Sequence, residues 1–156
     1  MEQQQSASEQ IGLRILHVDD DEDDRIFLAD ALKQLNFSHT ITGATGCIDL
    51  FKLMDEGAAY DLIVLDVNMP MIDGKQCLKR LKAHEKYRDI PVIIFTVTTS
   101  QQDIDEVYAS GAHYHVVKPY SSINFMAAMK KIFETDWKKN PAVPNREDFV
   151  INYAFI

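Results

Sequence analysis

Five polar side chains stand at positions where short apolar runs end. The clearest is Asp66, which directly follows the run Leu62 to Leu65. A short continuous apolar run bounded by turn residues is typical of a strand buried on both faces of a parallel sheet. In open α/β sheets, ligands bind outside the carboxyl ends of the strands. The other four groups occupy comparable positions, namely Asp19, Asp20, Thr96 and Lys118.

These five groups suit the handling of a phosphoryl group with a divalent cation. Three carboxylates packed together repel one another, and all of them can ionise if a hard cation lies among them. Mg²⁺ suits this position because it prefers oxygen ligands in octahedral geometry and keeps several waters. A lysine supplies positive charge to phosphate oxygens, and a threonine hydroxyl supplies a donor. Since an aspartate can attack a phosphoryl group to give an aspartyl phosphate, the set predicts phosphoryl transfer to the protein itself.

Each group also has a simpler interpretation. Asp66 could cap a turn or helix, Thr96 could be a strand-end hydroxyl, and Lys118 could be a solvated charge. The acidic run Asp19 to Asp24 could stabilise the start of the following helix through its dipole, and we assign that role to residues 21–24. The joint occurrence of the five groups at successive strand ends favours a common site.

The elements that must position these groups alternate regularly along the chain. Short apolar runs are each followed by a segment with apolar residues at helical spacing. Strands are expected at residues 13–18, 39–42, 62–65, 91–95 and 113–117, with helices between them and a fifth helix that reaches about residue 137. Strict alternation of strand and helix predicts a parallel sheet with helices on both faces.

Composition places the chain among ordinary globular proteins. Of its 156 residues, 46% are hydrophobic and 26% charged, and the formal net charge is −8. This negative charge argues against nonspecific binding to nucleic acid or to an anionic membrane. The first ten residues carry no basic residue and predict no signal peptide, and no apolar run is long enough to span a bilayer. We therefore expect a cytoplasmic protein.

The two cysteines, Cys47 and Cys77, both fall on apolar faces of predicted helices. In a cytosolic protein such residues are expected to be buried reduced thiols, while the sequence also leaves a disulfide open.

Four short motifs resemble those of the receiver domain of two-component response regulators. They occur in order and at the right intervals over about residues 13–137: Val18-Asp19-Asp20-Asp21, Leu65-Asp66-Val67-Asn68-Met69-Pro70 with Asp73-Gly74, Phe95-Thr96 and Val117-Lys118-Pro119. The resemblance implies a CheY-like fold, which is a flavodoxin-like (βα)5 doubly wound parallel sheet with strand order 2-1-3-4-5. The acidic run, with Phe133 and Trp137, is also similar to stand-alone receivers partnered with phytochrome-type histidine kinases.

The resemblance implies a phosphoacceptor and a metal site. Asp66 would accept the phosphoryl group. Asp20 and Asp66 would bind Mg²⁺ through their carboxylates, and Asn68 would bind it through its main-chain carbonyl. Asp19 would act on the metal through bound water.

Roles at the other two strand ends are also implied. Thr96 would donate to a phosphoryl oxygen, Lys118 would pair with that group, and the Lys118–Pro119 peptide bond would be cis. The family usually has Tyr or Phe three residues before this lysine, whereas this chain has His115. By strand alternation His115 shares one side of its strand with Val117. The resemblance implies that this side faces the surface between the fourth and fifth helices, and that His115 would swing inward when Thr96 moves. Imidazole titrates near neutral pH, so partner coupling is expected to weaken as His115 is protonated; a solvated histidine on an edge strand is the alternative.

The implied function is that of a single-domain response regulator in a phosphorelay. A sensor histidine kinase or histidine phosphotransfer protein would supply the phosphoryl group, and an unidentified downstream protein would bind the surface formed by the fourth helix, fifth strand and fifth helix. We expect a disordered lead (1–11), a receiver domain (12–139) and an apolar tail (140–156). The tail would pack on its own domain, for example by adding a strand to the sheet edge, or on a second copy in a homodimer; a disordered tail is the alternative. The length leaves no room for a DNA-binding module.

Two other functions fit parts of the sequence. A Mg²⁺-dependent phosphohydrolase of the haloacid-dehalogenase type also uses an aspartate nucleophile at a strand end, but it needs a second acid two residues later, where Asn68 stands. A phosphate-independent pseudo-receiver would act only as a docking module, and the complete acid set argues against it. We expect no enzyme in the usual sense, only a protein that catalyses its own phosphorylation from small phosphodonors and its own dephosphorylation.

Overall fold

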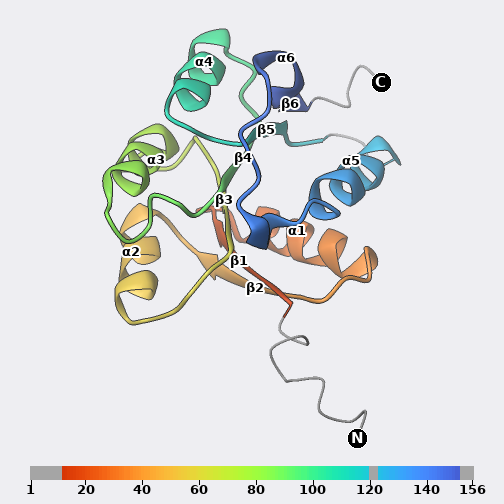
Figure 1. The fold of residues 1–156 in the computed structure, drawn as a ribbon, viewed down its shortest axis with the longest axis horizontal. Coiled ribbons are helices and arrows are strands. Elements are labelled where there is room, and N and C mark those ends of the chain that lie inside the picture. Colours follow the sequence, from red (N-terminus) through yellow and green to blue (C-terminus); the bar gives the residue numbers. More distant parts are fainter. Residues whose placement is uncertain (1–11, 120–122, 152–156) are drawn as a thin grey trace, which may run out of the picture.

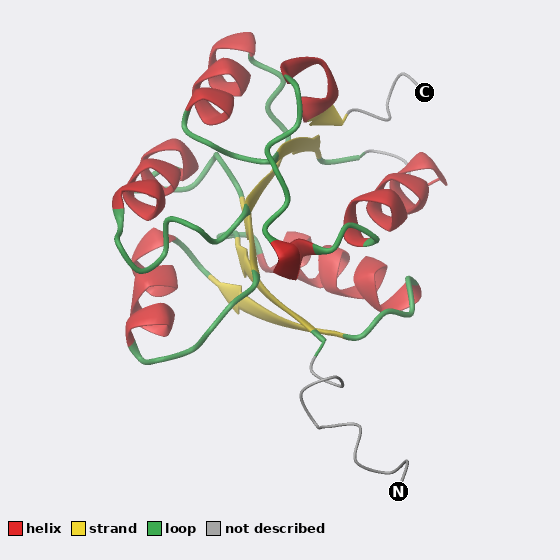
Figure 2. Ribbon diagram, viewed as in Figure 1, coloured by secondary structure: helices red, strands yellow, loops and turns green. Residues whose placement is uncertain are grey.

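The structure is a computed structural model that describes residues 12–119 and 123–151. The expected disordered lead lies outside the described residues. Within them, a single central sheet is sandwiched between helices (Figures 1 and 2). Among these residues, no helix is both long and apolar enough to cross a bilayer.

The sheet is parallel throughout and has six strands, in the order β2-β1-β3-β4-β5-β6. The predicted order 2-1-3-4-5 is therefore confirmed, with one more strand at the β5 edge. The strands are β1 (Leu13–Val18), β2 (His39–Ala44), β3 (Leu62–Leu65), β4 (Val92–Thr96), β5 (Tyr114–Val117) and β6 (Val150–Ile151).

Helices connect successive strands and cover both faces of the sheet (Figure 1). They are α1 (Glu22–Gln34), α2 (Cys47–Asp55), α3 (Gly74–Ala83), α4 (Gln101–Ala109), α5 (Ile123–Phe133) and α6 (Arg146–Phe149), with the 3-10 helix η2 (Trp137–Lys139) between the last two. The fifth helix ends four residues earlier than expected. The Ile132 carbonyl accepts from the Thr135 N–H at 3.2 Å and from the indole N–H of Trp137 at 3.0 Å. A continued α-helix would instead use the N–H four residues later.

Alternation along each strand divides the core into two clusters. On β3, Ile63 and Leu65 face the cluster that includes α2, α3 and α4, whereas Leu62 and Val64 face the cluster built with α1 and α5. All four side chains are buried. Because β3 is covered on both faces, its sequence is a continuous apolar run rather than an alternating one.

Polar side chains define the starts of three helices. Asp21 accepts from the backbone N–H of Asp23 at 2.9 Å at the start of α1, and Asp73 accepts from that of Gln76 at 2.9 Å at the start of α3. Ser100 caps α4 as the sequence predicts. Each cap satisfies a donor that has no partner inside the helix, and each helix thus begins just beyond the carboxyl end of a strand.

Two expectations about local covalent geometry are wrong. No cis peptide bond occurs among the described residues, so the Lys118–Pro119 bond is trans. The trans isomer of an X–Pro bond is favoured intrinsically by about 0.5–1 kcal/mol. Cys47 and Cys77 are joined in a disulfide rather than reduced. Neighbouring helices α2 and α3 bring their Cα atoms to 5.7 Å, which is inside the range that a disulfide spans.

The expectation that the tail packs on its own domain is confirmed for residues 140–151. Phe149 is fully buried, and β6 adds to the sheet beside β5. In Figure 1 the chain leaves η2 and crosses to α6, which lies near α4.

Candidate functional site

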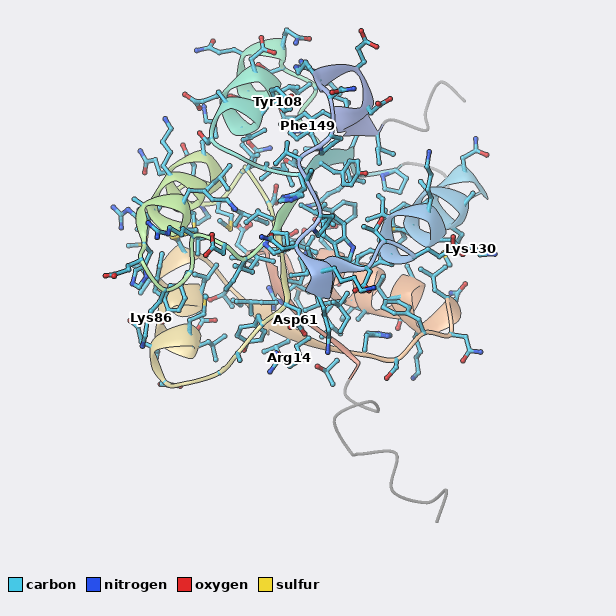
Figure 3. All side chains as sticks on the ribbon, in the orientation of Figure 1. Arg14, Asp61, Lys86, Tyr108, Lys130 and Phe149 are labelled. Carbon is cyan, nitrogen blue, oxygen red and sulfur yellow. A yellow bond between two sulfur atoms is a disulfide. The ribbon has the colours of Figure 1, made fainter. Side chains whose placement is uncertain are left out.

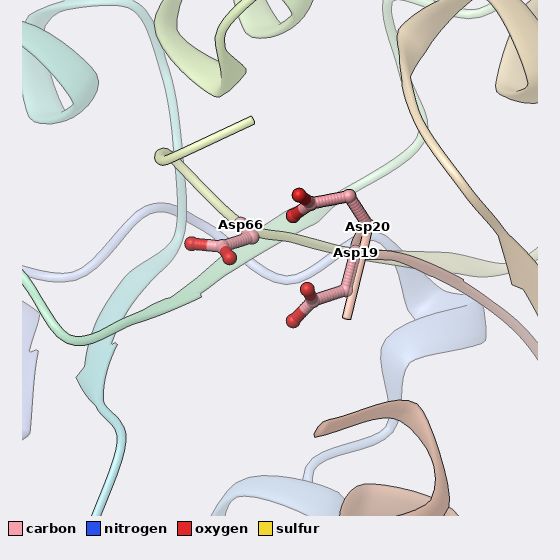
Figure 4. Close-up of side chains that lie close together, drawn as sticks. All are labelled: Asp19, Asp20 and Asp66. Carbon is pink, nitrogen blue, oxygen red and sulfur yellow. The ribbon is translucent and has the colours of Figure 1, made fainter. Parts of the chain in front are cut away.

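Three carboxylates meet at the carboxyl ends of the central strands. Asp19 and Asp20 follow β1, and Asp66 follows β3 (Figure 4). One oxygen from each of the three lies within 4.8 Å of the others. Asp19 and Asp66 are buried, whereas Asp20 is exposed. The structure thus brings together three of the four predicted metal ligands.

Backbone hydrogen bonds hold these residues in line with the sheet. The N–H of Asp19 donates to the Ala44 carbonyl at 3.0 Å, and the N–H of Asp66 donates to the Val18 carbonyl at 3.0 Å. Both bonds continue the strand ladders beyond the last strand residues. The carboxylates of Asp19 and Asp66 therefore project from backbone that is fixed by the sheet.

Lys118 lies at the centre of the acidic cluster. Its Nζ is 2.7 Å from Asp24, 2.8 Å from Asp19 and 3.1 Å from Asp66, and its side chain is 9% exposed. An ammonium group has three donors, so these contacts use all of them. Burial alone would lower the pKa of Lys118, but hydrogen bonds to Asp19 and Asp24 and the charge of Asp66 outweigh burial and raise it. Lys118 is therefore a permanent positive charge in this site.

The cluster carries more negative charge than one lysine balances. Burial raises the pKa of Asp19, and the neighbouring charge of Asp66 adds to the shift, while hydrogen bonds from Lys118 and from the Asp21 N–H oppose it. A carboxylate that resists ionisation beside two others is the situation that a hard cation relieves. The donor set consists only of carboxylate oxygens at this point, which is the chemistry that Mg²⁺ requires.

Thr96 and Asn68 lie next to this cluster. The Asn68 N–H donates to the Asp66 carboxylate at 3.2 Å, and the Asn68 side-chain amide lies 3.5 Å from the Thr96 hydroxyl. Thr96 is fully buried at the end of β4, and Asn68 is exposed. Thr96 is tied to the β5 end of the site as well, because its carbonyl accepts from the Lys118 N–H at 2.8 Å.

His115 is packed differently from the expectation. It is fully buried, because β6 covers the β5 edge and Phe149 lies over its ring. Its Nε2 lies 3.0 Å from the Thr98 carbonyl, and since a carbonyl only accepts, this nitrogen carries the proton. Burial lowers the pKa of His115. The alternative of a solvated histidine on an edge strand is therefore wrong.

Two residues of the site were missed or misjudged from sequence. Asp24 contacts Lys118 in addition to its position in the first turn of α1. No local pattern indicates this contact, because Asp24 and Lys118 lie 94 residues apart in the sequence. His17 is buried, and its Nε2 lies 3.8 Å from the Asp19 carboxylate. Burial, with the charges of Lys118 and Arg25, lowers the pKa of His17 to about 3.

Comparison with known families identifies the chain. A family model described as the response regulator receiver domain matches residues 15–130. The chain belongs to this family. Chemotaxis protein CheY-3 of Vibrio cholerae is 30% identical over 122 residues, which are 78% of this chain and 92% of the relative. The chain is thus a CheY-like receiver domain of the two-component signalling class.

Solved receiver domains share the fold. The phosphorylated cyanobacterial phytochrome response regulator RcpA has a TM-score of 0.73 at 21% identity, covering 86% of this chain and 99% of that one. The Mn²⁺-bound response regulator Rcp1 has a TM-score of 0.71 at 22% identity, covering 85% and 99%. The receiver domain of sensor histidine kinase PA1611 from Pseudomonas aeruginosa, with magnesium in its active-site cleft, has a TM-score of 0.67 at 24% identity, covering 82% and 98%.

Proposed function

We propose that this receiver accepts a phosphoryl group on Asp66 from a sensor histidine kinase or a histidine phosphotransfer protein. The observation that carries this proposal is the position of the Asp66 carboxylate. It is buried at the end of β3, within 4.8 Å of the Asp19 and Asp20 oxygens and 3.1 Å from the Lys118 ammonium. A nucleophilic oxygen and groups that can balance the phosphoryl charge therefore share one site.

The acidic cluster fits Mg²⁺. Asp19, Asp20 and Asp66 would hold the ion through carboxylate oxygens or bound water, and the main-chain carbonyl of Asn68 would complete the protein ligands. When bound, the ion would neutralise phosphoryl oxygens and align the group for in-line transfer. The manganese and magnesium named for the neighbouring receivers Rcp1 and PA1611 support a divalent cation.

The protein's own side chains would position and stabilise the transferred group. A carboxylate oxygen of Asp66 forms the new bond to phosphorus as the bond from phosphorus to the donor breaks. Lys118 then shifts its donor from the Asp66 carboxylate to a phosphoryl oxygen, and the Thr96 hydroxyl donates to another. Because the transferred group carries its charge on peripheral oxygens, fixed donors of this kind supply most of the stabilisation.

Phosphorylation would be read out on the surface of α4, β5 and α5. Thr96 and the loop after it connect the phosphoryl site to this surface, and His115 would respond to movement of Thr96. A downstream protein, or a second copy in a homodimer, would bind there. We place this signalling in the cytoplasm.

The direct test is labelling with acetyl phosphate in the presence of Mg²⁺. Intact-mass spectrometry should show the gain of one phosphoryl group by the wild type and none by Asp66→Asn, because an amide is no nucleophile here. Asp23→Asn is the control, since it removes one negative charge from an exposed position near the site. Undiminished labelling of Asp66→Asn would contradict the assignment.

A further inference from the structure

The C-terminal segment, residues 140–151, lies along the surface formed by α4 (Gln101–Ala109) and β5 (Tyr114–Val117), which we call the α4–β5 face. Figure 1 shows α6 near α4 and β6 beside β5. In the described part of the chain, β5 is flanked by β4 on one side and β6 on the other. The protein's own chain therefore fills a surface that the proposed function assigns to partners.

Phe149 is the apolar anchor of the segment. Its side chain is fully buried and belongs to the same core cluster as Ile104 and Val107 of α4. Its ring centroid lies 4.9 Å from that of Tyr108 and 6.4 Å from that of His115, and Figure 3 shows Tyr108 and Phe149 next to each other. Such separations are typical of favourable aromatic pairs, so Phe149 extends the core of the domain into the segment.

Polar contacts also hold the C-terminal segment against α4. Arg146 donates to the Asp105 carboxylate at 2.8 Å, and its guanidinium carbon lies 5.9 Å from the ring centroids of both Tyr108 and Phe149. The Tyr108 hydroxyl donates to the Pro144 carbonyl at 3.2 Å. The α4–β5 face thus offers an acid and an aromatic ring to one arginine.

Main-chain pairing completes the docking. Val150 and Ile151 lie opposite His115 and Val116 in a parallel ladder. Val150 packs against the α4 side of the core, whereas Ile151 packs against the α5 side. Addition of a short strand to a sheet edge, with side-chain anchors for specificity, is a common mode of peptide recognition.

We propose that residues 145–151 act as an internal competitor on the α4–β5 face, and that a partner binds there through a segment of the same chemistry, a short helical turn followed by a short strand. Such a partner segment carries an aromatic residue followed by aliphatic residues, with an arginine three positions before the aromatic one. This inference rests on the proposed function, which makes the face a partner site. The tethered segment competes at an effective concentration on the order of millimolar. A partner therefore binds the face only if its affinity is high enough to displace the segment.

The site of phosphorylation has a direct connection to the segment. Thr96 ends β4, and two residues later the Thr98 carbonyl accepts from His115, whose ring lies under Phe149. Movement of Thr96 toward a phosphoryl group would displace the same short loop. Phosphorylation and release of the segment are then expected to favour each other, because coupling between two sites is reciprocal.

The test uses the full chain and a fluorescent peptide with the sequence of residues 145–151, Asn-Arg-Glu-Asp-Phe-Val-Ile. Fluorescence anisotropy should show weak binding to the wild type, whose own segment occupies the face. Phe149→Ala loosens that segment and should bind the peptide at least about tenfold more tightly, because the tethered competitor is weakened. Val143→Ala, which changes an exposed apolar residue just before the competing residues 145–151, should behave like the wild type.

Further variants keep the test decisive. Arg146→Glu places a negative charge beside Asp105 without opening the core, and it should also increase peptide binding. It replaces Phe149→Ala in the test if Phe149→Ala fails to fold. A peptide in which alanine replaces the phenylalanine should bind none of the proteins. Equal peptide affinity for wild type and both loosened variants would overturn the proposal. Peptide binding is measured without Mg²⁺ or phosphodonor and does not depend on phosphorylation. If the wild type were not labelled by acetyl phosphate, that result would count against the proposed function alone.

Discussion

At the scale of single residues, Lys118 is already fully engaged. Its three donors bond Asp19, Asp24 and Asp66, so a phosphoryl group gains this lysine only by replacing one of them. Asp24 is the partner outside the metal cluster and is 37% exposed. It therefore holds Lys118 without contributing to the metal site.

Asp24→Asn tests this competition. The change weakens one hold on Lys118 and removes a negative charge near the incoming phosphoryl group, so the initial rate of labelling by acetyl phosphate should rise about two- to fivefold, as expected for a partly exposed ion pair. Asp23→Asn removes the same charge one residue earlier and should leave the rate nearly unchanged. Equal increases in both variants would show that net charge, and not the contact with Lys118, sets the rate.

Buried histidines make the stability depend on pH. Burial lowers the pKa of His115; its hydrogen bond to Thr98 and the Asp103 charge oppose the shift, while the Arg146 charge adds to it. The unfolded chain takes up a proton near pH 6.5, whereas folded His115 takes it up only at lower pH, so the free energy of unfolding falls as pH drops below about 6.5. Urea unfolding at pH 7.5 and 5.5 should show a smaller loss for His115→Gln, which does not titrate and keeps a donor for Thr98. The same loss in both proteins would exclude His115 as a contributor.

At the scale of elements, the loop between β3 and α3 depends on a close backbone approach at Gly74. The Gly74 N–H donates to the Val67 carbonyl at 2.8 Å, and a Cβ on Gly74 would lie 2.7 Å from the Val67 Cα and against the Asp66 carbonyl. Gly111 is a different case, because it has a positive φ of 97° at a turn. Gly74 therefore serves packing of the helix against the site rather than turn conformation.

Gly74→Ala should disturb the phosphoacceptor directly. Because backbone must move to admit the methyl group, we expect a loss of about 1–3 kcal/mol in the free energy of unfolding and slower labelling of Asp66. Gly46→Ala is the matched control, since nothing lies within 4 Å of the added Cβ. Chemical denaturation and mass spectrometry measure the two effects, and normal labelling of a folded Gly74→Ala protein would contradict this account.

Local patterns predicted the elements well where the signal was long enough. Apolar runs and helical spacing correctly predicted five strands and five helices, because period and length are properties of neighbouring residues. β2 runs two residues further than expected, to Ala44, because its pairing with β1 continues there. β6 is only two residues long, which gives no period to detect, although the apolar character of the tail indicated that it packs. The contact between Asp24 and Lys118 joins residues 94 apart in sequence and left no local signal for the pairing.

At the scale of the whole molecule, the Cys47–Cys77 disulfide links α2 to α3 across one face of the sheet. It closes a loop with a sequence separation of 30, for which chain entropy gives about 3–4 kcal/mol of stabilisation. Reductant should therefore lower the urea midpoint of the wild type, and a Cys47→Ser, Cys77→Ser double variant should not respond. An unchanged midpoint of the wild type would show that the bridge adds nothing to stability.

The order of the strands has a consequence for synthesis on the ribosome. After β1 and β2, each later strand joins the growing edge of the sheet in the order in which it is made, from β3 to β6. Roughly 30 residues separate β5 from β6, so at about 5–20 residues per second the nascent sheet has an open β5 edge for a few seconds. An unpaired edge is a template for pairing with another chain. The arrival of β6 ends that exposure, so β6 protects the newly made β5 edge from pairing with another chain.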